Sequence, residues 1–283
     1  MIRLSAFSDE AGKEFSAQIA ALLRNNIHLT ELRSVGSKNV KDLTLDEARE
    51  ISLELQKNGI ALSALGSPMG KVDITVDIEE YLKDVRHMCE LAKILGTDRI
   101  RMFSFFNAYG ERDKVIDYML RMVDVAKEYG ITLCHENEKK IYGDTVERIL
   151  DIRENVPGLA FVYDPANFLQ CDEMPDKTLP ALHGLAAYFH IKDVVHETGE
   201  LVPAGHGDGQ IDRLVRMIEG DTILTLEPHL KLFGSYKQID GEEMKHRFRF
   251  DTNDEAFDAA VTAMKKILTE NGYREENGGF VRV

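Results

Sequence analysis

Cysteine is scarce in this chain. Its 283 residues include three cysteines, which lie far apart in the sequence: Cys89, Cys134 and Cys171. An odd and scattered set does not fit a disulfide framework. We therefore interpret the cysteines as reduced thiols and expect a cytoplasmic protein.

Long apolar runs and basic patches are also missing. No run is long enough to span a bilayer and no leader pattern opens the chain, so we expect no membrane partner. The formal net charge is −14, and a protein this acidic repels phosphate backbones. The densest basic stretch, residues 245–249, is short and flanked by acids. We therefore expect no nucleic-acid partner.

The chain contains a repeated pattern of a short apolar segment followed by an amphipathic one. The apolar segments, which we predict as strands, begin about 30 residues apart, the size of a βα unit; they are residues 2–7, 29–32, 61–65, 99–103, 131–136, 159–164, 187–190 and 222–227. Predicted helices between and after them include residues 13–25, 44–58, 113–129, 144–153, 175–183, 211–219 and 255–270. No Pro/Ser-rich linker interrupts the series. The sequence therefore predicts an α/β protein, a single (β/α)₈ TIM barrel over residues 1–283, with its active site at the C-terminal face of the strands.

A potential metal ligand closes each of the last four predicted strands: Glu136, Asp164, His190 and Glu227. If these strands are parallel neighbours, their C-terminal ends meet on one face and the four side chains converge. Two glutamates, an aspartate and a histidine form a mostly oxygen set, which suits Mn²⁺ or Mg²⁺ better than a thiolate-preferring metal. The alternative is that the four residues separately form caps and salt bridges.

Five segments together resemble the sugar phosphate isomerase/epimerase superfamily, the xylose isomerase-like TIM-barrel group that includes ketose 3-epimerases, inosose dehydratases and endonuclease IV. They are residues 133–138, 162–167, 189–193, 203–209 and 224–227. The resemblance implies one divalent metal ion held by Glu136, Asp164, His190 and Glu227. We expect Mn²⁺, with Mg²⁺, Co²⁺ or Zn²⁺ as other candidates.

The resemblance also implies a reaction. Glu136 and Glu227 would act as catalytic acid and base on a small carbohydrate, removing a proton α to a carbonyl while the metal stabilises the enediolate. We therefore expect a sugar isomerase or epimerase. A dehydratase or lyase acting on a keto-sugar or keto-inositol shares the proton abstraction and is the competing hypothesis. A non-catalytic barrel that binds sugar is the alternative of another class.

The departures from endonuclease IV weigh against DNA repair. That branch needs additional histidines after strands three and four, where this chain has residues 66–69 and 101–104, which contain none. It also needs a histidine at the position of Asn167. One metal for small-molecule chemistry remains the expectation.

Other residues near the strand ends are candidates for binding substrate, and they are Arg101, Asn167, Lys192, Asp193 and His206. Lys192 and Asp193 could instead pair with each other at the barrel rim, and His206 could belong to an ordinary glycine-rich loop. Residues 231–250 form a long insertion after strand eight, which we interpret as a lid, a homo-oligomer contact or a solvated hairpin. No glycine-rich loop followed by lysine suggests a phosphate site.

Overall fold

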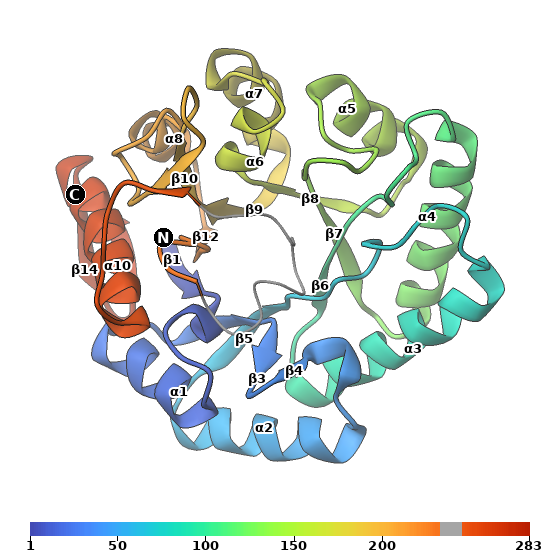
Figure 1. The fold of residues 1–283 in the computed structure, drawn as a ribbon. Coiled ribbons are helices and arrows are strands. Elements are labelled where there is room, and N and C mark those ends of the chain that lie inside the picture. The colour runs from blue at the N-terminus through green and yellow to red at the C-terminus, as the bar shows by residue number, and fades with distance from the viewer. Residues whose placement is uncertain (233–244) are drawn as a thin grey trace.

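Eight parallel strands form a barrel surrounded by helices (Figure 1). The computed structural model describes residues 1–232 and 245–283. The barrel strands are β1 (Ile2–Ala6), β2 (Leu29–Leu32), β5 (Ala61–Leu65), β6 (Arg99–Met102), β7 (Thr132–Glu136), β8 (Ala160–Tyr163), β9 (Ala186–Ile191) and β12 (Thr222–Leu226). They pair in the order β1-β12-β9-β8-β7-β6-β5-β2. The ring closes where β1 lies beside β2, and the Thr30 hydroxyl donates to the Ala6 carbonyl at 3.0 Å. The predicted (β/α)₈ fold is confirmed.

Several of the surrounding helices begin or end at residues that the sequence marks as caps. They are α1 (Phe15–Arg24), α2 (Leu45–Lys57), α3 (Ile78–Leu95), α4 (Arg112–Glu128), α5 (Val146–Asn155), α6 (Pro165–Leu169), α7 (Pro175–Leu182), α8 (Ile211–Met217) and α10 (Asn253–Glu270). Thr44 and Glu47 form the capping box that opens α2. Gly96 ends α3 at φ 81°, a conformation that glycine adopts without steric cost. No helix in the described part of the chain is long and apolar enough to cross a bilayer.

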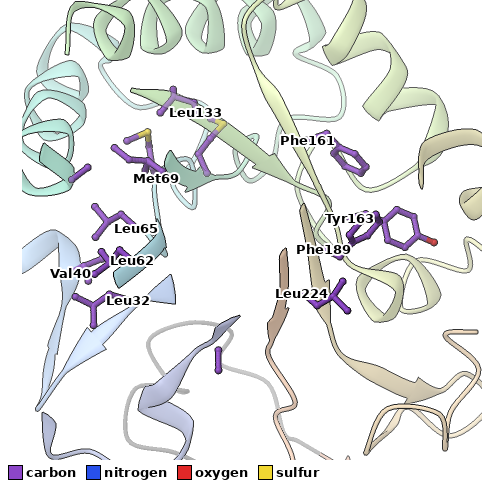
Figure 2. Close-up of a cluster of buried hydrophobic side chains, with 14 of the residues drawn as sticks. Leu32, Val40, Leu62, Leu65, Met69, Leu133, Phe161, Tyr163, Phe189 and Leu224 are labelled. Carbon is purple, nitrogen blue, oxygen red and sulfur yellow. The ribbon is translucent and has the colours of Figure 1, made fainter. Parts of the chain in front are cut away.

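Alternation along the strands divides the apolar residues between two cores. Leu133, Phe161, Phe189 and Leu224 belong to the large cluster in which the strands pack against the helices (Figure 2). Their neighbours Cys134, Val162, Tyr188 and Ile223 form a separate small cluster with Ala64. Successive side chains of a strand point to opposite faces, so these two clusters lie on the two sides of the barrel wall.

Features outside the sequence prediction include two ribbons. A C-terminal hairpin, β14 (Tyr273–Glu276) and β15 (Gly279–Arg282), adds to β1 through the pair Ile2 and Phe280. Ile2 is the first residue of β1, so the hairpin meets the barrel wall at the end opposite the strand C-termini. A ribbon of β10 (Asp193–Val195), β11 (Glu200–Val202) and β13 (Lys245–His246) follows β9.

Candidate metal centre

Four side chains from neighbouring strands meet at the C-terminal face of the barrel. Glu136, Asp164, His190 and Glu227 each offer one ligand atom, and these atoms lie within 4.8 Å of one another. All four residues are buried, with at most 4% of their surface exposed. Two residues before each ligand stands an inward-facing residue: Cys134, Val162, Tyr188 and Thr225. Because side chains two residues apart on a strand point to the same face, the four ligands also point inward, one layer nearer the C-terminal end of the barrel.

Asparagine side chains fix the Asp164 corner of this cluster. Asp164 is the N-cap of α6, and its Oδ1 accepts the backbone N–H of Asn167 at 2.9 Å. The Asn167 amide donates to Glu136 Oε1 at 3.2 Å. Asn137 bonds the Asp164 backbone in both directions, donating to its carbonyl and accepting its N–H. These bonds leave Asp164 Oδ2 directed into the cluster.

The orientation of His190 is set by a fully buried carboxylate, Glu31. His190 Nε2 lies 3.1 Å from Glu31 Oε2, a contact in which Nε2 would donate and the carboxylate oxygen would accept. The Nδ1 atom then faces Glu136 Oε1 at 3.0 Å and Glu227 Oε2 at 3.5 Å. A carboxylate behind the imidazole is the usual arrangement for a metal-binding histidine.

The cluster has the donor set and the charge deficit that a cation would satisfy. Asp164 Oδ2, His190 Nδ1 and Glu227 Oε2 are buried and make no hydrogen bond within the described part of the chain, which is costly unless another ligand binds them. Among described residues, the carboxyl groups in contact around the cluster are Asp9, Glu10, Glu31, Glu136, Asp164 and Glu227. The cations paired with them are Arg33, Arg101 and Lys192. The carboxyl groups outnumber the cations in this cluster, and a divalent ion would reduce that imbalance.

The pKa shifts reflect this crowding of carboxyl groups. Burial would lower the pKa of His190, but Glu136 and Glu31 raise it well above its usual value. Burial raises the pKa of Asp164 to about 7, against the opposing effect of Lys192. Burial also acts to raise the pKa of Glu227, but Lys192 and His190 outweigh it and hold the pKa well below normal. Without a metal, His190 therefore holds a proton that a metal ion would displace.

A cavity of about 670 Å³ lies next to the cluster, although none of the four ligand residues is among those that line it. Lys192 and His229 line it and connect it to the cluster, since Lys192 Nζ lies 3.0 Å from Asp164 Oδ2 and His229 Nε2 lies 3.5 Å from Glu227 Oε1. The β10–β11 ribbon supplies one wall through Val194, His196 and Leu201. The volume is suitable for a small organic molecule.

The predicted substrate-binding residues occupy three different environments. Lys192 lies between the cluster and the cavity. Arg101 is buried beside the cluster, with Nε 3.4 Å from Glu136 Oε2 and its guanidinium over the Phe103 ring. Asn167 bonds Glu136, as described above. His206 is exposed and packs against Phe248, with ring centroids 5.3 Å apart, so it is not part of the cluster. Substrate contact by these residues stays a prediction.

Asp193 faces a loop backbone instead of the cavity. Its carboxylate accepts the backbone N–H groups of Val194, Gly205, Gly207 and Gly209 at 2.8–3.1 Å. A Cβ at Gly207 would lie 2.4 Å from Asp193 Oδ1, so only glycine fits there. The contacts of Asp193 differ from the alternative in which it pairs with Lys192, and they indicate a role in anchoring the ribbon wall.

Several site residues carried no distinctive pattern in the sequence. Glu31 precedes the end of β2 and orients His190. Glu10 lies in a 3₁₀ turn after β1 and accepts the His229 backbone N–H at 2.8 Å. His229 follows Glu227 by two residues and has φ 47°, an uncommon conformation for a non-glycine residue. Its spacing from Glu227 was the one available signal.

The predicted insertion at residues 231–250 falls largely on residues 233–244, which lie outside the described residues. Its described flanks sit near the cavity: Lys245 lines the cavity, and His246 Nε2 lies 2.9 Å from the His229 carbonyl oxygen. A lid role for this segment stays a prediction.

The fold and the site together define a TIM barrel with a buried carboxylate and histidine cluster at its C-terminal face. Residues 26–250 match the family model described as xylose isomerase-like TIM barrel, and the chain belongs to this family. The resemblance stated from the five sequence segments is thereby confirmed.

Solved structures of similar fold include several enzymes. The probable 3-DHS dehydratase AsbF from Bacillus anthracis is 15% identical, with a TM-score of 0.70 and coverage of 95% of this chain and 99% of that one. The IOLI protein with a binding zinc atom is 16% identical, with a TM-score of 0.70 and coverage of 95% and 99%. D-psicose 3-epimerase from Clostridium cellulolyticum H10 is 12% identical, with a TM-score of 0.69 and coverage of 94% and 98%. Identities this low establish the fold alone. No curated protein matches the chain.

Proposed function

We propose that this protein is a metal-dependent isomerase or epimerase of a small sugar or sugar derivative. The observation that carries the proposal is the arc Glu136–Asp164–His190–Glu227, whose ligand atoms are buried and lie within 4.8 Å of one another. Glu136, Asp164, His190 and Glu227 would hold one divalent ion, with Mn²⁺ favoured by the mostly oxygen ligand set. The ion would supply Lewis-acid polarisation of a substrate carbonyl.

The two glutamates would work on opposite sides of a substrate. Glu136 ends β7 and Glu227 follows β12, while β8 and β9 lie between these strands. Epimerisation needs a base on one face of a carbon and a proton donor on the other, and two carboxyl groups at the ends of an arc meet that need. Arg33 donates to Glu227 Oε1 at 2.8 Å and would fix the orientation of this carboxylate.

Replacement of the base tests the proposal. We expect Glu227→Gln to lower solvent-deuterium exchange into a ketose substrate by about 10²–10⁴-fold, because the amide retains an oxygen but cannot accept the α-proton. Glu128→Gln, at the exposed end of α4, is the matched control and should exchange at the parent rate. A panel of ketoses, keto-inositols and sugar acids would be screened with Mn²⁺-loaded protein. Exchange by Glu227→Gln at the parent rate would contradict the role of Glu227.

One observation favours dehydration as a second candidate. Lys192 is buried, lines the cavity and lies 3.7 Å from Glu227 Oε2. An ammonium group beside the base could protonate a departing hydroxyl after the α-proton is removed, a step that epimerisation does not need. Loss of water from a keto-sugar, detected by mass spectrometry and abolished in Lys192→Met, would favour the dehydratase. The cytoplasmic location, the single domain and a homo-oligomer stay predictions.

A further inference from the structure

A second group of metal-ligand residues shares Glu227 with the candidate metal centre. Glu10, Glu227 and His229 each offer an atom within 4.8 Å of the others, and all three are buried. On side-chain chemistry alone, this group could bind a second ion bridged to the first through the Glu227 carboxylate. A two-metal site would support different chemistry from a one-metal site, so the occupant of this group matters for the reaction.

A guanidinium group contacts all three of these side chains. Arg33 Nη1 lies 2.8 Å from Glu227 Oε1 and 3.5 Å from His229 Nε2, and Nη2 lies 3.2 Å from Glu10 Oε1. Each contact is within reach of a hydrogen bond or a close ion pair. A metal ion bound by the same three residues would have to share this space with a fixed positive charge.

Arg33 is locked in this position from its other sides. Its Nε and Nη2 donate to the two oxygens of Asp9 at 3.1 and 3.0 Å, the bidentate geometry that a guanidinium favours. Its Cζ lies 4.3 Å from the centroid of the Phe7 ring, which makes a T-shaped contact with the His190 ring. The side chain is 2% exposed. Arg33 is therefore a rigid and permanent cation in the second group.

We propose that Arg33 takes the place of a second metal ion, restricting this site to one ion and positioning Glu227. It bonds Oε1 of Glu227 and leaves Oε2 toward Glu136, Asp164 and His190. The inference rests on the metal site of the proposed function, and it adds that this site binds one metal ion per chain. Arg33 acts through Glu227 and is a positioning residue.

The experiment counts ions. Wild-type protein saturated with Mn²⁺ and freed of excess ion should carry one Mn²⁺ per chain, measured by elemental analysis. Arg33→Met removes the charge at similar length, so Glu10, Glu227 and His229 should accept a second Mn²⁺, and the shared carboxylate should produce an exchange-coupled pair in the electron paramagnetic resonance spectrum. Arg33→Lys keeps the cation and should remain at one ion. Glu10→Gln in the Arg33→Met background should return the count to one.

Two further outcomes keep the inference separate from the proposed function. If Arg33→Met does not fold because the buried Asp9 carboxylate loses the positive charge of Arg33, Asp9→Asn with Arg33→Met removes the negative charge as well and should still bind two ions. Two ions on the wild type would overturn the role of Arg33. A single ion on folded Arg33→Met, or on folded Arg33→Met with Asp9→Asn, would overturn it as well. Neither result would contradict the proposed function. Zero ions on the wild type would contradict the proposed function itself.

Discussion

The two faces of the barrel wall differ sharply although the same strands build both. The outward face, where Phe161 and Leu133 pack against the helices, is apolar and fully packed. The inward face ends in buried cations and in carboxyl groups, of which single oxygens of Asp164 and Glu227 make no hydrogen bond within the described part of the chain. Burial of apolar surface stabilises the fold, whereas unsatisfied buried polar atoms cost stability. This contrast indicates that the outward face stabilises the fold, whereas the C-terminal end of the inward face is suited to bind a ligand.

The largest expected effect is on the outward face. Phe161 is 4% exposed between the strands and the helices (Figure 2), so Phe161→Ala should lower the free energy of unfolding by about 3–5 kcal/mol. Mn²⁺ affinity should stay within about threefold, because Phe161 points away from the cluster. Urea unfolding and metal titration measure the two quantities, and Phe161→Leu serves as the milder control. A large loss of metal affinity in folded Phe161→Ala would break the division between the two faces.

The inward face should show the reverse behaviour. Asp164→Asn keeps the N-cap of α6 and removes a ligand, so Mn²⁺ affinity should fall more than about 100-fold, beyond the loss typical of an outer-shell residue. Burial raises the pKa of Asp164 to about 7, so its ionisation opposes folding at higher pH. The metal-free variant should therefore melt at the same temperature as the wild type at pH 8, or higher. A lowered melting temperature with metal affinity intact would reverse this assignment.

A smaller effect is expected from pH. A metal ion binds the deprotonated forms of its ligands, so protons compete with it. The pKa of Asp164, about 7 without metal, means that this carboxyl binds no proton well above pH 7 and one well below it. Below pH 7, each pH unit should therefore lower Mn²⁺ affinity by an additional factor of about ten, compared with the change per pH unit above pH 7. Calorimetric titrations from pH 5.5 to 8.5 measure the slope, and in Asp164→Asn the change of slope near pH 7 should vanish.

Much of this arrangement could be predicted from the sequence. The eight strands and the convergence of Glu136, Asp164, His190 and Glu227 followed from apolar segments that each end in a ligand, because parallel strands end on one face. The contacts of Glu31 with His190 and of Arg33 with Glu227 could not be predicted this way. They form because the barrel closes and brings β2 opposite β9 and near β12, a fact of three-dimensional geometry that no local pattern encodes.

Other differences have local causes. The hairpin of β14 and β15 has a turn signal at Asn277 and Gly278, both with positive φ. Its first strand, Tyr273–Glu276, is mostly charged and exposed, so it lacks the apolar alternation that marks a strand. Asp193 was expected near substrate because it follows His190, but the glycine N–H groups that it binds lie more than ten residues further along the chain.

The most direct test of the metal centre is anomalous diffraction from a crystal of the wild-type protein saturated with Mn²⁺. We predict one strong peak within about 2.0–2.6 Å of one atom from each of Glu136, Asp164, His190 and Glu227. We predict no second peak among Glu10, Glu227 and His229, where Arg33 lies. A Mn²⁺-saturated crystal with no peak at the four ligands would contradict the account.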